Sequence, residues 1–99
     1  MLNIQKKANG SELTFSLEGR LDTTTAPTLE SELKSSLNGV DSLIFDIKDL
    51  QYISSAGLRV LLSAQKVMNK QGSMVVRNAC EDVKEIFDVT GFADILTIE

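Results

Sequence analysis

Two adjacent serines, Ser54 and Ser55, are the residues of this sequence with the clearest capacity for chemistry. They stand between an apolar segment that ends at Ile53 and a helical pattern that includes Leu58. The first turn of a helix has unpaired N–H groups and the positive end of the helix dipole, so it accommodates a phosphate. Two roles are therefore open. One serine caps the helix, or a kinase phosphorylates one of the two hydroxyls.

Gly57 lies in the first turn of the same predicted helix. Glycine at such a position costs about 1 kcal/mol relative to alanine, which indicates a steric demand. Close approach of a partner or a neighbouring loop would explain it, and so would close packing on a strand. The sequence does not separate these explanations.

Residue content excludes several catalytic classes. The chain has no histidine, which removes Ser-His-Asp and Cys-His nucleophile pairs and nearly all zinc sites. Asp46 and Asp49 are a candidate carboxylate pair for acid–base work or Mg²⁺, but a chain of 99 residues leaves little room for an enclosed cavity. Cys80 is expected to be buried or to cap a helix, because no second cysteine or histidine assists it. We therefore expect that the protein is not an enzyme and that it binds no cofactor and no metal.

Charge and cysteine usage limit the partners and the compartment. The formal net charge is −4 and the ten lysines and arginines are scattered, so we expect no nucleic acid partner. No apolar run approaches the length of a membrane span or of a signal peptide, so we expect no membrane insertion. A single cysteine cannot form an internal disulfide, which favours a cytoplasmic location.

The first elements that must position the serines are two strands. Leu2 and Ile4 alternate with polar residues, and Asn9-Gly10 is a strong turn signal before the alternating residues 13–17. This pattern predicts a hairpin, and residues 19–22 are expected to leave the sheet.

The rest of the chain alternates helices with apolar strands. Thr25 as a cap and Pro27 in the first turn predict a helix start, and leucines at 29, 33 and 37 give it one apolar face. A buried strand follows over 43–47, and the chain is expected to turn over 49–53. A second helix follows, with apolar residues at 58, 61, 62 and 68. The pattern then continues with a strand at 74–76, a third helix at 81–89 and a closing segment at 95–98.

This order predicts one α/β domain over residues 1–99. Strands separated by helices pair in parallel through right-handed crossovers, and the hairpin adds an antiparallel neighbour. The expected architecture is a mixed sheet of four to five strands, with helices packed mainly on one face.

Four segments of the sequence resemble the motifs of a known family. They are Gly19–Asp22 (GRLD), Asp46–Leu50 (DIKDL), Tyr52–Leu61 (YISSAGLRVL) and Val83–Phe92 (VKEIFDVTGF). In this order, over essentially all 99 residues, they resemble the STAS domain, and in particular the bacterial anti-sigma factor antagonists.

The resemblance implies a phosphorylation-controlled partner switch. An unphosphorylated antagonist binds an anti-sigma factor that is also a serine kinase, which releases a sigma factor for transcription. The kinase phosphorylates a serine, the complex dissociates, and a serine phosphatase resets the antagonist. The acceptor that the resemblance implies is Ser55, two residues before Gly57. Ser54 is the alternative, because it occupies a position that is often aspartate in the family.

The resemblance also implies a partner-binding surface around this serine. Its residues are Asp22, Asp49, Ser54, Ser55, Ala56, Gly57, Leu58 and Arg59. Leu58 and Val60 are candidates for exposed apolar contacts. The alternative function is that of a STAS subunit of a transporter or lipid-trafficking complex, without a serine switch.

Overall fold

Alternating apolar residues build the expected N-terminal hairpin. A computed structural model describes residues 2–99 and places β1 (Leu2–Asn9) antiparallel to β2 (Glu12–Leu21). Gly10 occupies the turn with φ +63°, a conformation that glycine adopts without strain. On β2, three successive inward residues of the alternating pattern, Leu13, Phe15 and Leu17, are buried.

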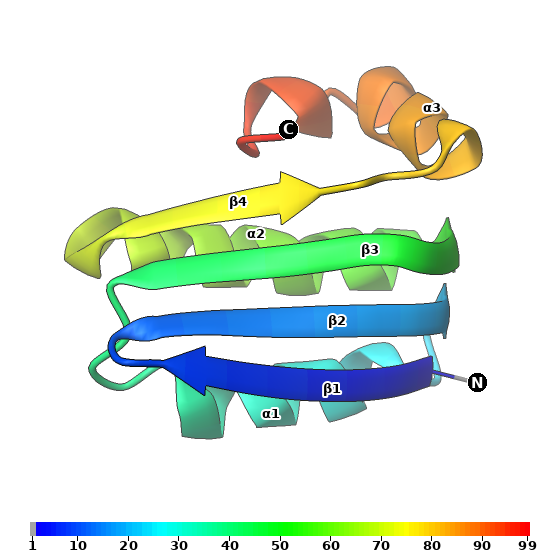
Figure 1. The fold of residues 1–99 in the computed structure, drawn as a ribbon. Helices are drawn as coiled ribbons and strands as arrows, with labels where there is room; N and C mark the ends of the chain where they lie inside the picture. The colour runs from blue at the N-terminus through cyan, green and yellow to red at the C-terminus, as the bar shows by residue number, and fades with distance from the viewer. Residues whose placement is uncertain (1) are drawn as a thin grey trace.

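Two helical crossovers extend the hairpin into a four-stranded sheet of order β1-β2-β3-β4. Helix α1 (Ala26–Ser36) leads to β3 (Ser42–Ile53), which is parallel to β2. Helix α2 (Ser55–Gln71) leads to β4 (Ser73–Arg77), which is parallel to β3. Figure 1 shows α1 and α2 on the same face of the sheet, as the sequence predicted, while the other face carries no helix.

The C-terminal part of the chain lies beyond the β4 edge (Figure 1). It consists of α3 (Glu81–Thr90) and a short 3-10 helix η1 (Phe92–Asp94) that packs against α3. The expected closing segment at 95–98 meets the sheet through one isolated parallel bridge between Val76 and Ile98. Within residues 2–99, no helix is long and apolar enough to cross a membrane.

Strands β2 and β3 extend further than their sequences suggested. Residues 19–22 were expected to leave the sheet and 49–53 to turn, yet β2 continues to Leu21 and β3 to Ile53. Register shifts explain the difference, because Glu18 pairs with Asp49 and Arg20 pairs with Tyr52, so β3 carries two additional residues.

The bulges change the spacing of the inward positions on β3. Ile47, Leu50 and Ile53 are all buried, and they follow one another at every third residue. A period of two no longer applies where a bulge inserts a residue, so the sequence of this segment does not read as a strand. Strand β3 therefore leads directly into α2, and β2 ends beside the start of that helix, at Leu21.

The core lies between the helical face of the sheet and the helices. Phe15 and Phe45 stack from neighbouring strands with ring centroids 5.7 Å apart. Each helix buries the residues of its inner face. These are Leu29 and Leu33 of α1, Leu61 and Met68 of α2, and Val83 and Phe87 of α3. This packing fixes both ends of α2, and therefore the position of its first turn.

Candidate functional site

Ser54 is the cap of helix α2. Its backbone is extended, and its hydroxyl oxygen accepts a hydrogen bond from the Gly57 N–H at 3.3 Å. Its carbonyl accepts from the Leu58 N–H at 2.9 Å, and its own N–H donates to the Leu21 carbonyl at 2.8 Å. Ser54 therefore joins the end of β2 to the start of α2, and its hydroxyl serves the helix.

Ser55 is the first residue of α2 and is exposed to solvent. Within residues 2–99 its hydroxyl makes no hydrogen bond, in contrast to the half-buried Ser54. It lies at the positive end of the helix dipole, where added negative charge is favourable. The two serines thus differ in their surroundings, and of the two only the Ser55 hydroxyl is both exposed to solvent and without a hydrogen bond within residues 2–99.

Close packing on the sheet accounts for Gly57. A Cβ atom at this position would lie 2.7 Å from Cγ of Leu21 and 2.9 Å from Cγ1 of Ile53. Both neighbours are fully buried, so they have no free space to move into. Of the explanations that the sequence left open, strand packing is the one that the structure supports.

Several residues expected at the binding surface lie in the core. Gly57 and Leu58 are buried, with Leu58 only 4% exposed, and Val60 is 5% exposed. The expectation of an exposed Leu58 or Val60 is therefore wrong, because both side chains belong to the apolar face of α2. Ala56 is half-buried and Arg59 is exposed.

Asp22 organises the loop between β2 and α1. Its Oδ1 accepts hydrogen bonds from the Thr24 hydroxyl at 2.7 Å, the Thr24 N–H at 3.0 Å and the Thr25 N–H at 3.1 Å. These bonds, with that of the Thr24 hydroxyl first, lower the pKa of the Asp22 carboxyl from its ordinary value. Since Leu21 is bonded to Ser54, this loop adjoins the start of α2.

Thr25 does not cap α1 through its side chain as expected. Its hydroxyl instead donates to the Arg20 carbonyl at 2.9 Å and accepts from the Asp22 N–H at 2.8 Å. These two bonds occupy the hydroxyl, and Pro27 in the first turn has no N–H to donate to it.

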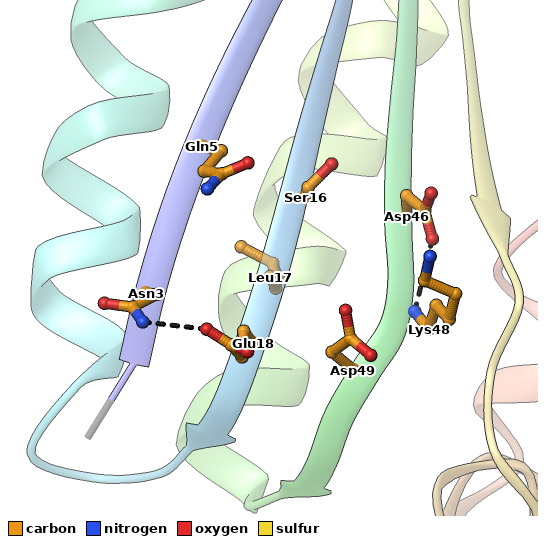
Figure 2. A pocket seen from close by; sticks show the side chains of 8 residues that line it. All are labelled: Asn3, Gln5, Ser16, Leu17, Glu18, Asp46, Lys48 and Asp49. Atoms are coloured by element: carbon orange, nitrogen blue, oxygen red, sulfur yellow. Dashed lines mark hydrogen bonds between the residues drawn. The ribbon is translucent and has the colours of Figure 1, made fainter.

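Asp49 lies away from the serines, on the open face of the sheet. It contributes to a shallow polar hollow (Figure 2). The other lining residues are Asn3, Gln5, Ser16, Leu17, Glu18, Asp46 and Lys48. Asp46 Oδ1 accepts from the Lys48 N–H and from Asn78 Nδ2, both at 3.2 Å. The structure therefore does not bring Asp49 to the start of α2, and no cluster of three or more ligating side chains suited to a metal occurs in residues 2–99.

An arginine–tyrosine pair at the ends of β2 and β3 was not foreseen. The guanidinium carbon of Arg20 lies 4.4 Å from the ring centroid of Tyr52, and Arg20 Nε lies 3.9 Å from Asp22 Oδ2. The residues are cross-strand partners only in the bulged register, so sequence spacing gave no signal for their contact.

A shallow hollow between the first turns of α1 and α2 completes the site. It is lined by Thr23, Ala26, Pro27, Glu30, Ala56, Arg59 and Val60. Cys80 lies elsewhere, ahead of α3, where its thiol donates to the Leu50 carbonyl at 3.4 Å and makes no side-chain cap. The site as a whole is an open surface, which suits contact with another protein.

Comparison with known proteins gives one consistent family. The model of the STAS domain matches residues 3–99. An anti-sigma-B factor antagonist of Bacillus subtilis is 32% identical over 98 residues, covering 98% of this chain and 90% of that protein. An anti-sigma F factor antagonist of Paenibacillus polymyxa is 27% identical, covering 98% of this chain and 86% of that protein.

Solved structures show the same fold. An anti-sigma factor antagonist from Mycobacterium paratuberculosis superimposes with a TM-score of 0.89 at 18% identity, covering 99% of this chain and 85% of that chain. The Bacillus cell fate determinant SpoIIAA in its phosphorylated form gives a TM-score of 0.76 at 15% identity, covering 98% and 91%. The family match agrees with the motifs around the two serines and with the mixed sheet that carries its helices on one face. The chain belongs to the STAS domain family.

Proposed function

We propose that this protein, with residues 1–99 acting as one STAS domain, is an anti-sigma factor antagonist controlled by phosphorylation of Ser55. The observation that carries the proposal is the division of labour between the serines. The Ser54 hydroxyl accepts the bond that caps the helix, while Ser55 is exposed and its hydroxyl makes no hydrogen bond within residues 2–99. Membership of the STAS family and the names of the relatives support the general role.

Phosphorylation leaves the fold intact and changes the surface. A kinase transfers the γ-phosphoryl group of ATP to Ser55 Oγ, which loses its proton, and ADP leaves. The phosphate carries about −1.5 to −2 charges, which the first turn of α2 tolerates because its N–H groups and dipole favour an anion. The cap survives, since the bond from the Gly57 N–H goes to Ser54 and not to Ser55.

The added charge opposes binding of the anti-sigma factor. A partner surface packed on the uncharged Ser55 would have to desolvate a hydrated dianion, which costs several kcal/mol without a matching cation. A loss of about 3 kcal/mol lowers affinity by roughly a hundredfold. Exposed Arg59 and half-buried Ala56 adjoin Ser55 on α2 and contribute contacts. Buried Gly57 and Leu58 act by setting the position of the backbone.

The remaining parts of the switch are supplied by other proteins in the cytoplasm. The proposed partners are an anti-sigma factor that is also the serine kinase, and a serine phosphatase that resets Ser55. Asp22 holds the loop beside the helix start in place, through its bonds to Thr24 and Thr25. The antagonist itself performs no catalysis and needs no cofactor.

The test is a phosphorylation reaction followed by mass spectrometry. The cognate kinase and ATP are incubated with wild type, Ser55→Ala and the matched variant Ser54→Ala, and the modified residue is located. Phosphate on Ser55 in wild type and in Ser54→Ala, with none in Ser55→Ala, supports the proposal. Phosphate on Ser54 alone refutes the assignment. Capture of a membrane ATPase complex instead of a kinase from native lysate would favour the transporter or lipid-trafficking role.

A further inference from the structure

Helix α3 lies beyond the β4 edge (Figure 1), and it carries an apolar side chain, Val89, that is exposed to solvent. Its inner residues, Val83 and Phe87, are fully buried. On the outer side Val89 is 80% exposed and lines a shallow hollow with the half-buried Ile86. Single exposed apolar residues are common on protein surfaces, so the charges around the hollow decide its meaning.

The hollow on α3 has an acidic border. We define the α3 face as Asp82, Glu85, Ile86, Val89 and Thr90, the residues that line it. The helix carries four carboxylates and one lysine, a net charge of −3 in a chain whose net charge is −4. Within residues 2–99, no ion pair involves a carboxylate of α3. The charge of the protein is therefore concentrated where its most exposed valine lies.

Helix stability accounts for only part of this charge. Glu81 and Asp82 lie in the first turn, where carboxylates are favourable to the helix dipole. Asp88 lies near the C-terminal end, where a carboxylate is unfavourable, and the last turn contains no basic residue. Glu85 lies beyond the first turn and faces the hollow. The helix dipole therefore accounts for Glu81 and Asp82 but not for Glu85 and Asp88.

We propose that the α3 face is a docking surface for a basic amphipathic helix of a partner protein. Apolar side chains of such a helix would cover Val89 and Ile86, and its lysines or arginines would face Glu85 and Asp82. The negative charge of the α3 face is complementary to a positively charged surface and disfavours nucleic acids and anionic membranes, so its charge favours a basic protein segment. This proposal does not rest on the serine switch.

The charge on Ser55 distinguishes the two surfaces. Added negative charge at the start of α2 weakens binding of the anti-sigma factor in the proposed switch. It does not repel a basic partner on α3, so docking there persists in the phosphorylated protein. A partner of the α3 face would thus be held in both states of Ser55.

The test uses a synthetic helical peptide of leucine and lysine, titrated into ¹⁵N-labelled protein at low salt. The control peptide has the same composition in a scrambled, non-amphipathic order. We expect amide shifts centred on α3 for the amphipathic peptide and at least threefold weaker binding of the scrambled one. Val89→Ser and Glu85→Gln are each expected to weaken binding about threefold, because each removes one apolar or ionic contact.

Matched variants identify the surface. Val67→Ser changes an exposed valine of α2 that lines a groove against α1, and Glu12→Gln changes an exposed carboxylate of β2. Both are expected to leave affinity unchanged, as is Ser55→Asp. All substituted positions are exposed, so each variant should fold, which circular dichroism checks. Shifts centred on the α1–α2 groove, equal binding of the scrambled peptide, a larger loss with Val67→Ser, or no binding at all would overturn the proposal.

Discussion

Replacing Gly57 by alanine tests whether the glycine serves the fold or a partner. The new Cβ would lie 2.7 Å from Cγ of Leu21, 3.0 Å from its Cδ2 and 2.9 Å from Cγ1 of Ile53. Overpacking of this kind costs about 1–3 kcal/mol. Alanine returns about 0.5–1 kcal/mol of helix propensity. We therefore expect a net loss in the free energy of unfolding of about 1 kcal/mol, and of about 2.5 kcal/mol at most; a loss of about 1 kcal/mol lowers Tm by roughly 4–8 °C.

Urea denaturation of Gly57→Ala measures this loss, with Ser63→Ala as a matched control on an exposed position of α2. A double-mutant cycle with Leu21→Ala locates its cause. Leu21→Ala is destabilising by itself, but it opens space for the new methyl group, so the penalty of Gly57→Ala should fall by at least about 0.5 kcal/mol in its presence. If Gly57→Ala were fully stable yet lost binding to the anti-sigma factor, the glycine would serve the partner and our reasoning would be wrong.

Four further substitutions test the site and the core. Ser55→Asp should keep its circular dichroism spectrum and cooperative melting but bind the anti-sigma factor roughly a hundredfold more weakly by titration calorimetry; an unfolded variant or unchanged affinity would contradict this. Ser54→Ala should lose about 1 kcal/mol of stability in urea through loss of the cap, whereas an equal loss in Ser55→Ala would contradict the assigned roles. Gln65→Leu should gain about 0.5–1 kcal/mol of stability, because the buried Oε1 has no hydrogen-bond partner within residues 2–99 and the substitution removes one bond there, from Nε2 to Asn69 Oδ1 at 2.9 Å; a destabilised variant would contradict this. The folded state lowers the pKa of the Asp22 carboxyl, so the stability that Asp22 contributes is present above its ordinary pKa of 3.8 and is lost as pH falls through the lower folded value. Chemical denaturation should therefore show that the free energy of unfolding falls less between pH 7 and pH 2 in Asp22→Asn than in wild type; an equal fall would contradict this.

Regular periodicity accounts for what the sequence predicted correctly. The leucines of α1, the apolar stripe of α2 and the alternating residues of β2 each follow the period of their element, so type and inward face were predictable. The start of α2 at the serines was predictable because a capping residue precedes a helical pattern there.

Contacts between elements account for what the sequence could not reveal. The bulges that extend β3 to Ile53 depend on its pairing with β2, and the stacking of Arg20 on Tyr52 exists only in that register. The separation of Asp49 from the serines has the same origin, because its place on the open face follows from the strand that 49–53 forms. The packing reason for Gly57 required the positions of Leu21 and Ile53.

The anchoring of the α2 start has a consequence for the speed of signalling. The hydrogen bond from the Ser54 N–H to the Leu21 carbonyl and the close packing of Gly57 on Leu21 and Ile53 hold the first turn of α2 against β2 and β3. A new charge there has no structural rearrangement to wait for. In the proposed switch, the lifetime of each state would then be governed by the turnover of the kinase and phosphatase and by the residence time of the bound anti-sigma factor. Slow relaxation of the antagonist would add no delay.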